Sequence, residues 1–159
     1  FTKVELYKYK ADTGEAESEE IEISEIPSLS TDGFVVCDIS VEPSIIHLIA
    51  KCLQLDMITN EVQTSSIEKG LQKELSVRPW GHDLVAQILE NFGIKVLLIK
   101  IHTLKEETGT YYATIFLQKG NRILALDSKP SDAIAIATRA DAEIYIKEEL
   151  LDKYGKKIC

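Results

Sequence analysis

Three aspartates and a histidine stand where the sequence pattern places the ends of helices and strands. His82 and Asp83 open the run HDLVAQILENF, Asp127 closes the run NRILALD, and Asp132 opens a run of alternating alanine and isoleucine. Carboxylates of this kind bind hard cations such as Mg²⁺ or Mn²⁺. Histidine titrates near neutral pH and serves as a general acid or base. The same stretches carry two cations that could pair with a carboxylate or a phosphate, Arg78 and Lys129.

The order of the expected elements predicts that these residues meet. A helix over 82–92 joins a strand over 94–102 through Gly93 alone, so the helix and the strand run in opposite directions. The strands after it form an antiparallel meander that ends at residue 127, beside the start of the next helix. The residues expected at this common edge are His82, Asp83, His102, Thr110, Asp127, Ser131 and Asp132. Two helix N-termini there would favour an anion.

The whole pattern predicts an α+β fold with an antiparallel or mixed sheet around the meander 94–127. Strands are expected at 3–10, 20–26, 32–40 and 142–146. Packing helices are expected at about 42–54, 82–92, 131–139 and 147–154. In the helix over 42–54, His47 lies off the apolar stripe, which indicates a surface residue. The stretch 55–77 contains a capping box from Ser65 to Glu68 and predicts a short helix.

Composition indicates one globular domain over residues 1–159, with 153–159 as a C-terminal tail. The net charge of −8 disfavours sequence-independent binding of nucleic acid, which depends on clustered lysine and arginine. The three cysteines form no C-x-x-C pair, and their odd number suits a reduced, cytoplasmic setting. The apolar runs are too short to span a membrane. Edge strands and an apolar sheet predict a homo-oligomer.

A purely structural interpretation accounts for the same polar residues. Ser131, Asp132 and Asp83 suit the first turn of a helix, where they cap backbone N–H groups and complement the helix dipole. Arg78 could neutralise Asp127. Sequence motifs for a phosphate-binding P-loop, a dinucleotide site, a zinc protease or a nucleophile elbow are absent from the sequence.

Several blocks of the chain resemble the bifunctional nuclease domain family. The blocks are RPWGHDL (78–84), GTYYATIFL (109–117) and LDSKPSDAIAIATRADAEIYIKEELL (126–151), and the resemblance covers about residues 78–152. VVCDISVEP (35–43) is similar to the family's strand-to-helix unit, with Glu42 at an acidic position. The family usually has threonine where Gly81 stands and arginine where Lys129 stands, and a lysine loses the bidentate geometry of arginine. Residues 55–77 look like an insertion in the family's plan.

The resemblance implies a compact domain with nuclease activity in some family members. It implies that the catalytic residues are His82, Asp83, Asp127 and Asp132, and that substrate phosphate is bound by Arg78, Thr110, Lys129 and Ser131. We therefore consider two hypotheses. In the first, Asp127 and Asp132 hold Mg²⁺ or Mn²⁺ and the domain hydrolyses DNA or RNA. In the second, the domain is a non-catalytic binding or assembly module, and the polar cluster is a structural clamp.

Overall fold

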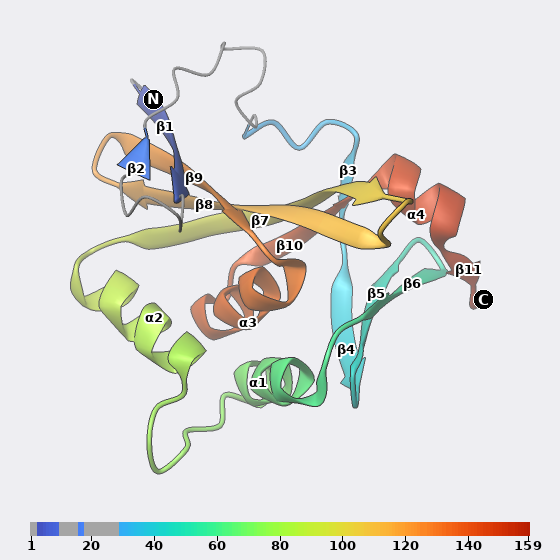
Figure 1. The fold of residues 1–159 in the computed structure, drawn as a ribbon, viewed down its shortest axis with the longest axis horizontal. Helices are drawn as coiled ribbons and strands as arrows, with labels where there is room; N and C mark the ends of the chain where they lie inside the picture. The colour runs from blue at the N-terminus through green and yellow to red at the C-terminus, as the bar shows by residue number, and fades with distance from the viewer. Residues whose placement is uncertain (1–2, 10–15, 18–28) are drawn as a thin grey trace.

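The computed structural model describes the backbone of residues 3–9 and 16–17 and all of residues 29–159. Within them, helices and strands build the predicted α+β fold, in which the strands form two sheets (Figure 1). The strand predicted over 20–26 lies outside the described residues. The strand predicted over 32–40 is present but divides at Cys37 into two strands that belong to different sheets.

The larger sheet contains the predicted meander at its centre. Its seven strands lie in the order β2 (Ala16–Glu17), β1 (Lys3–Tyr9), β9 (Arg122–Ser128), β8 (Thr110–Lys119), β7 (Lys95–Lys105), β10 (Glu143–Lys147) and β3 (Phe34–Val36). β7, β8 and β9 are antiparallel, whereas β1 runs parallel to β9 and β10 runs parallel to β7. The sheet is therefore mixed, with an antiparallel centre and a parallel pairing on each side of it.

The smaller sheet replaces the helix predicted over 42–54, and that prediction was wrong. Its strands lie in the order β11 (Lys156–Lys157), β6 (Leu53–Ile58), β5 (Ile45–Ala50) and β4 (Asp38–Glu42). β5 and β6 form a hairpin whose two turn residues, Lys51 and Cys52, both have positive φ. Such a turn matches the twist of paired strands. β-branched isoleucines supply much of β5, and these residues favour a sheet.

Four helices accompany the sheets in the described part of the chain. They are α1 (Glu61–Gln72), α2 (Gly81–Asn91), α3 (Pro130–Ala140) and α4 (Glu148–Tyr154). α1 begins before the predicted capping box, because the Asn60 side chain accepts a hydrogen bond from the Gln63 amide at 2.9 Å. Together with β6, α1 occupies most of the stretch 55–77, and its Ile67 is fully buried.

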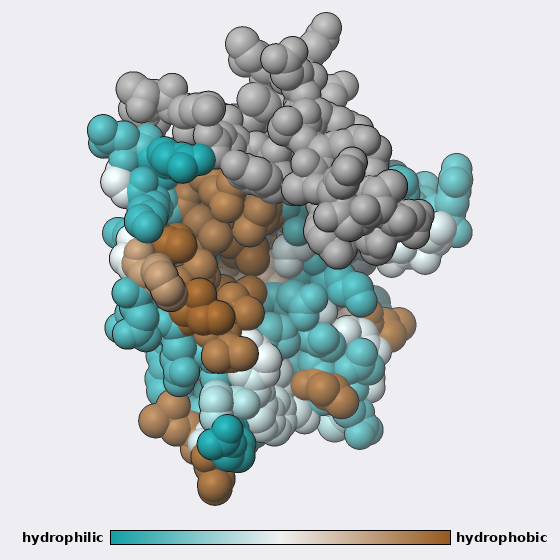
Figure 2. Space-filling model, turned by 60° about the vertical axis from the view of Figure 1, so that its left-hand side comes forward, coloured by the Kyte–Doolittle hydropathy of each residue, from teal (hydrophilic) through white to brown (hydrophobic). Residues whose placement is uncertain are grey.

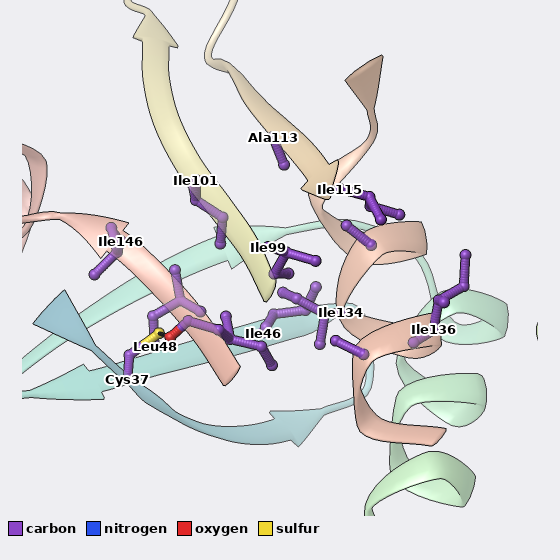
Figure 3. Close-up of a cluster of buried hydrophobic side chains, with 14 of the residues drawn as sticks. Cys37, Ile46, Leu48, Ile99, Ile101, Ala113, Ile115, Ile134, Ile136 and Ile146 are labelled. Atoms are coloured by element: carbon purple, nitrogen blue, oxygen red, sulfur yellow. Dashed lines mark hydrogen bonds between the residues drawn. The ribbon is translucent and has the colours of Figure 1, made fainter. Parts of the chain in front are cut away.

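α3 contributes a run of buried side chains to the hydrophobic core (Figure 3). Its alternating alanines and isoleucines are buried from Ala133 to Ala137. Ile134 belongs to the same buried cluster as Ile99 of the larger sheet and Ile46 of the smaller one. The small alanines let α3 approach its neighbours closely, so α3 fixes the position of any group at its N-terminus.

α2, predicted as a packing helix over 82–92, carries an apolar stripe that is mostly exposed. Leu89 packs against the core, but the exposed fractions are 51% for Leu84, 47% for Ile88 and 66% for Phe92. Figure 2, which turns this side of the molecule toward the viewer, shows hydrophobic atoms gathered at its surface. The stripe therefore contributes little to the core of a single chain.

Two of the three cysteines form a disulfide that the spacing of the cysteines did not indicate. Cys52 in the β5–β6 turn and Cys159 form a disulfide with a Cα–Cα distance of 5.3 Å, whereas Cys37 is free and buried. Residues 107 positions apart in sequence meet because β11 pairs with β6. A long-range meeting of this kind has no signature in the spacing of the cysteines.

Candidate functional site

The entry to α2 is anchored by a nearly buried ion pair between Asp83 and Arg139. Arg139 Nε donates to Asp83 Oδ1 at 2.7 Å, and the side chains are 8% and 12% exposed for the arginine and the aspartate. The Trp80 amide donates to the other carboxylate oxygen at 2.8 Å. Burial alone would raise the pKa of Asp83, but the bonds from Arg139 and Trp80 outweigh it and lower the pKa. Asp83 is thus fully used in holding α2 against α3.

His82 lies between a serine of α1 and an aspartate of α3. Its Nε2 donates to Asp132 Oδ1 at 2.8 Å, and its Nδ1 lies 2.6 Å from Ser66 Oγ. The His82 side chain is 17% exposed, and that of Asp132 is 38% exposed. Ser66 is buried and also accepts a bond from Arg139 Nη2 at 3.1 Å. Asp132 is therefore the member of this chain of bonds that faces solvent, and His82 stands behind it.

A pocket of about 240 Å³ opens at the start of α3, and we call it the α3 pocket. Three of the predicted phosphate-binding residues line it: Thr110, Lys129 and Ser131. Lys129 is the N-cap of α3 and makes no side-chain capping bond, so the first N–H groups of the helix are not capped by it. Asp132 follows Ser131 in the first turn of α3, but neither Asp132 nor His82 is part of the pocket lining.

Asp127 and His102 do not join this cluster, contrary to the predicted convergence. Neighbouring residues of a strand face opposite sides of the sheet, and Leu126 packs on the α3 side. Asp127 therefore faces the other side, where it is exposed and lies opposite Thr114. His102 is also on that side, with Nε2 3.0 Å from Thr114 Oγ1. The topology brought these strand ends to one edge, but the alternation of side chains separates them.

The predicted metal pair, Asp127 and Asp132, is divided by the sheet. Two carboxylates on opposite faces cannot share one ion. Among residues 3–9, 16–17 and 29–159, no group of three or more histidine, cysteine, aspartate or glutamate side chains is arranged to hold a metal. The donor geometry thus does not fit the metal site that the sequence suggested.

The sequence indicated neither Ser66 nor Arg139 as a member of the cluster. Arg139 stands seven residues after Asp132, two helical turns away on the same face, and this spacing was the available signal. Ser66 was hidden by the interpretation of Ser65 as a helix cap, although Ser65 lies inside α1. Arg78 was expected to pair with Asp127, and it is exposed. The arginine that pairs with an aspartate of the cluster is Arg139, which is bonded to Asp83.

His47, expected at the surface, is buried between two carboxylates. Its Nδ1 lies 2.6 Å from Asp56 Oδ1 and its Nε2 lies 2.7 Å from Glu42 Oε2. The hydrogen bond to Asp56 is the main cause that raises the pKa of His47, and the contact with Glu42 adds to it. Because both ring nitrogens face acceptors, the protonated imidazolium fits this position best. The sequence analysis missed this contact because it interpreted the stretch 42–54 as a helix, whereas His47, Asp56 and Glu42 meet across the paired strands β4, β5 and β6.

Comparison with known proteins shows which family the chain resembles. Residues 49–158 match the family model of the Bifunctional nuclease domain. An uncharacterised protein of Mycobacterium tuberculosis is 33% identical over 78 residues, which are 49% of this chain and 44% of that protein. Bifunctional nuclease 1 of Oryza sativa subsp. japonica is 30% identical over 109 residues, 67% of this chain and 32% of the plant protein.

A second plant relative shows a similar identity and coverage to the first. Bifunctional nuclease 1 of Arabidopsis thaliana is 28% identical over 109 residues, which are 67% of this chain and 33% of that protein. The chain therefore spans about a third of the length of the plant relatives, at 32% and 33%, and under half of the mycobacterial one, at 44%. The family model covers α1, which lies in the stretch 55–77, together with α2, α3 and α4. By this match, the chain belongs to the bifunctional nuclease domain family.

Proposed function

We propose that the domain hydrolyses phosphodiester bonds of nucleic acid at the start of α3. The observation that carries the proposal is the contact of His82 Nε2 with Asp132 Oδ1 at 2.8 Å, in the same first turn of α3 whose Ser131 lines the α3 pocket. A histidine–carboxylate pair next to a helix N-terminus combines a proton acceptor with a site that favours an anion. The family match and the names of the plant relatives agree with this chemistry.

In the proposed reaction, Asp132 takes a proton from water and the water oxygen attacks the phosphorus. His82 keeps the Asp132 carboxylate oriented by donating from Nε2, and Ser66 fixes the ring from its other side. Lys129 and the N-terminus of α3 stabilise the negative charge that develops on the phosphate oxygens. The bond from phosphorus to the leaving sugar oxygen breaks, and solvent supplies the proton to that oxygen.

The test is cleavage of fluorescent single-stranded DNA and RNA by the purified protein, with Mg²⁺, Mn²⁺ or EDTA. We expect Asp132→Asn to lower the rate at least 100-fold, because a positioned general base contributes about 10²- to 10⁴-fold. Asp141→Asn is the matched control, since Asp141 is an exposed aspartate that follows the C-terminal end of the same helix. Equal cleavage by wild type and Asp132→Asn would indicate a contaminating nuclease and overturn the proposal. The EDTA arm tests the predicted need for Mg²⁺ or Mn²⁺ without relying on Asp127.

The alternative function, a non-catalytic binding or assembly module, is favoured by a different part of the cluster. Asp83 bonds to Arg139 and to the amide of Trp80, which is the geometry of a clamp between two helices. Arg139 Nη1 also donates to the carbonyl oxygens of Ser66 and Ala135. Cleavage that stays absent under every metal condition, together with strong destabilisation by Asp83→Ala, would favour this alternative.

For partners, we propose nucleic acid as substrate and a second copy of the chain as the occupant of the exposed stripe on α2. A net charge of −8 on each copy repels association in general. The exposed positions Leu84, Ile88 and Phe92 are uncharged, so two such faces could meet without like-charge contact.

Within the described residues, no helix has the length and apolar content to cross a membrane. A cytoplasmic location is a further proposal, although the Cys52–Cys159 disulfide is more typical of oxidising compartments.

A further inference from the structure

We infer that the α3 pocket binds a single nucleotide unit, with its phosphate at the N-terminus of α3 and its nucleoside against the apolar wall of β6. The inference rests on the proposed function and adds the class of substrate: a mononucleotide or the terminal nucleotide of a single strand, rather than the interior of a duplex.

The phosphate end of the pocket is formed by Lys129 and Ser131. Ser131 is 6% exposed and lines the pocket. A hydroxyl group in this position can donate a hydrogen bond to a phosphate oxygen that enters the pocket. Lys129 precedes the helix and Pro130 occupies its first position, so the first N–H group available to an anion is that of Ser131.

The strands β5 and β6 of the smaller sheet supply an apolar wall of the pocket. Ile46 and Met57 are buried beneath it, whereas Ile58 at the end of β6 is 88% exposed beside it. Tyr111 and Thr110 supply the remaining side from the start of β8. A flat apolar group such as a nucleobase would cover Ile58 and could stack against the tyrosine ring, which binds bases with little regard to sequence. A bare phosphate would leave this wall unused.

Size and charge both favour one nucleotide over a long polymer. The cavity volume of about 240 Å³ lies below the roughly 300–1,000 Å³ of pockets that enclose drug-sized ligands. A net charge of −8 repels a long polyanion more strongly than it repels one phosphate. The local positive charge is confined to Lys129 and the helix end, which suits one phosphate group.

The test is isothermal titration of the whole protein with thymidine 5′-monophosphate, thymidine 3′-monophosphate, thymidine and inorganic phosphate, in EDTA so that no turnover occurs. We expect at least one monophosphate to bind at least tenfold more tightly than thymidine or inorganic phosphate. Lys129→Gln and Ser131→Ala should each weaken this binding at least fivefold. Lys119→Gln is the matched control, since Lys119 is an exposed lysine at the other end of β8, and it should bind as wild type does.

The possible results separate the inference from the proposed function. Tight monophosphate binding that depends on Lys129 supports the nucleotide site even if no substrate is cleaved. Binding of inorganic phosphate as tight as that of the tighter-binding monophosphate would overturn the role of the apolar wall. Absence of binding by every probe, or binding unaffected by Lys129→Gln and Ser131→Ala, would overturn the site while leaving cleavage through Asp132 to its own assay. Preference for the 5′- or the 3′-phosphate then indicates which strand end the pocket accepts.

Discussion

Arg139, in the last turn of α3, donates to Asp83, in the first turn of α2, at 2.7 Å, and both side chains are almost buried. The bond joins the end of one helix to the beginning of another across 56 positions of sequence. It also sets the position of the neighbouring His82, because Asp83 fixes the first turn of α2 through the Trp80 amide.

Replacement of Asp83 by alanine should destabilise the fold by roughly 3–5 kcal/mol, because it leaves the buried Arg139 charge without its partner. Urea unfolding followed by circular dichroism measures this change. The control is Asp141→Ala, which breaks an ion pair with Lys73 in which the aspartate is 82% exposed. That variant should lose no more than about 1 kcal/mol. Equal losses in the two variants would contradict a clamp at Asp83.

The pKa values of His47 and His102 should be shifted in opposite directions from the pKa of an ordinary histidine. The bond to Asp56 raises the pKa of His47, so its contribution to stability is complete below about pH 6.5 and is lost as the pH rises through the folded-state pKa. Burial lowers the pKa of His102, so its contribution is complete above about pH 6.5 and is lost as the pH falls through the folded-state pKa. Imidazole resonances followed by NMR across this range report both values. A shared midpoint near 6.5 would contradict the prediction.

Substitution of Gly70 by alanine should destabilise the contact between α1 and α3. A Cβ atom on Gly70 would lie 2.1 Å from Thr138 Oγ1, closer than real Cβ contacts, so the Thr138 side chain or one of the two helices must shift. The cost should be about 1–3 kcal/mol, since overpacking outweighs the better helix propensity of alanine. The control is Gly81→Ala at the start of α2, where a Cβ meets nothing within 4 Å. Thermal unfolding of both variants provides the comparison, and an unchanged Gly70→Ala protein would contradict the close approach.

Introduction of a charge on α2 should dissociate the proposed oligomer. Ile88→Asp would place a carboxylate in the middle of the exposed stripe, where it would be desolvated if two copies pack there. Light scattering after size exclusion should give more than one chain per particle for wild type and one for Ile88→Asp. Val62→Asp serves as control, because Val62 is a 72% exposed apolar residue on α1. A wild-type monomer at tens of micromolar would contradict this interface.

The meander and its helices were predictable because their signals are local. Gly93 ends α2 with positive φ, and the Ile94 amide bonds back to the Leu89 carbonyl oxygen at 2.8 Å, as the glycine suggested. The stretch 42–54 was wrongly predicted to be a helix because its isoleucines and leucines fit a helical stripe as well as paired strands. The turn at Lys51 and Cys52 that decides between them uses residues that rarely adopt positive φ.

The candidate site was predicted in part for a related reason. The predicted order of helices and strands correctly placed His82 near Asp132. Thr110, Lys129 and Ser131, which were predicted to bind phosphate, line one pocket in the structure. The predicted order also assigned Asp127 to the same edge, since an argument from strand direction carries no information about which face a side chain occupies. Ser66 and Arg139 depended on how α1 crosses α3, which is set by Gly70 and Thr138 rather than by a local pattern.

The bond between Cys52 and Cys159 closes nearly all of the family-matched segment 49–158 into a covalent ring. A single cut by a protease at any exposed loop within the ring, such as the turn at residues 106–109, leaves the two pieces attached to each other. The nicked molecule keeps its mass on a non-reducing gel and separates into fragments only after a thiol reductant is added. Backbone cleavage inside the ring therefore does not by itself release any part of the domain.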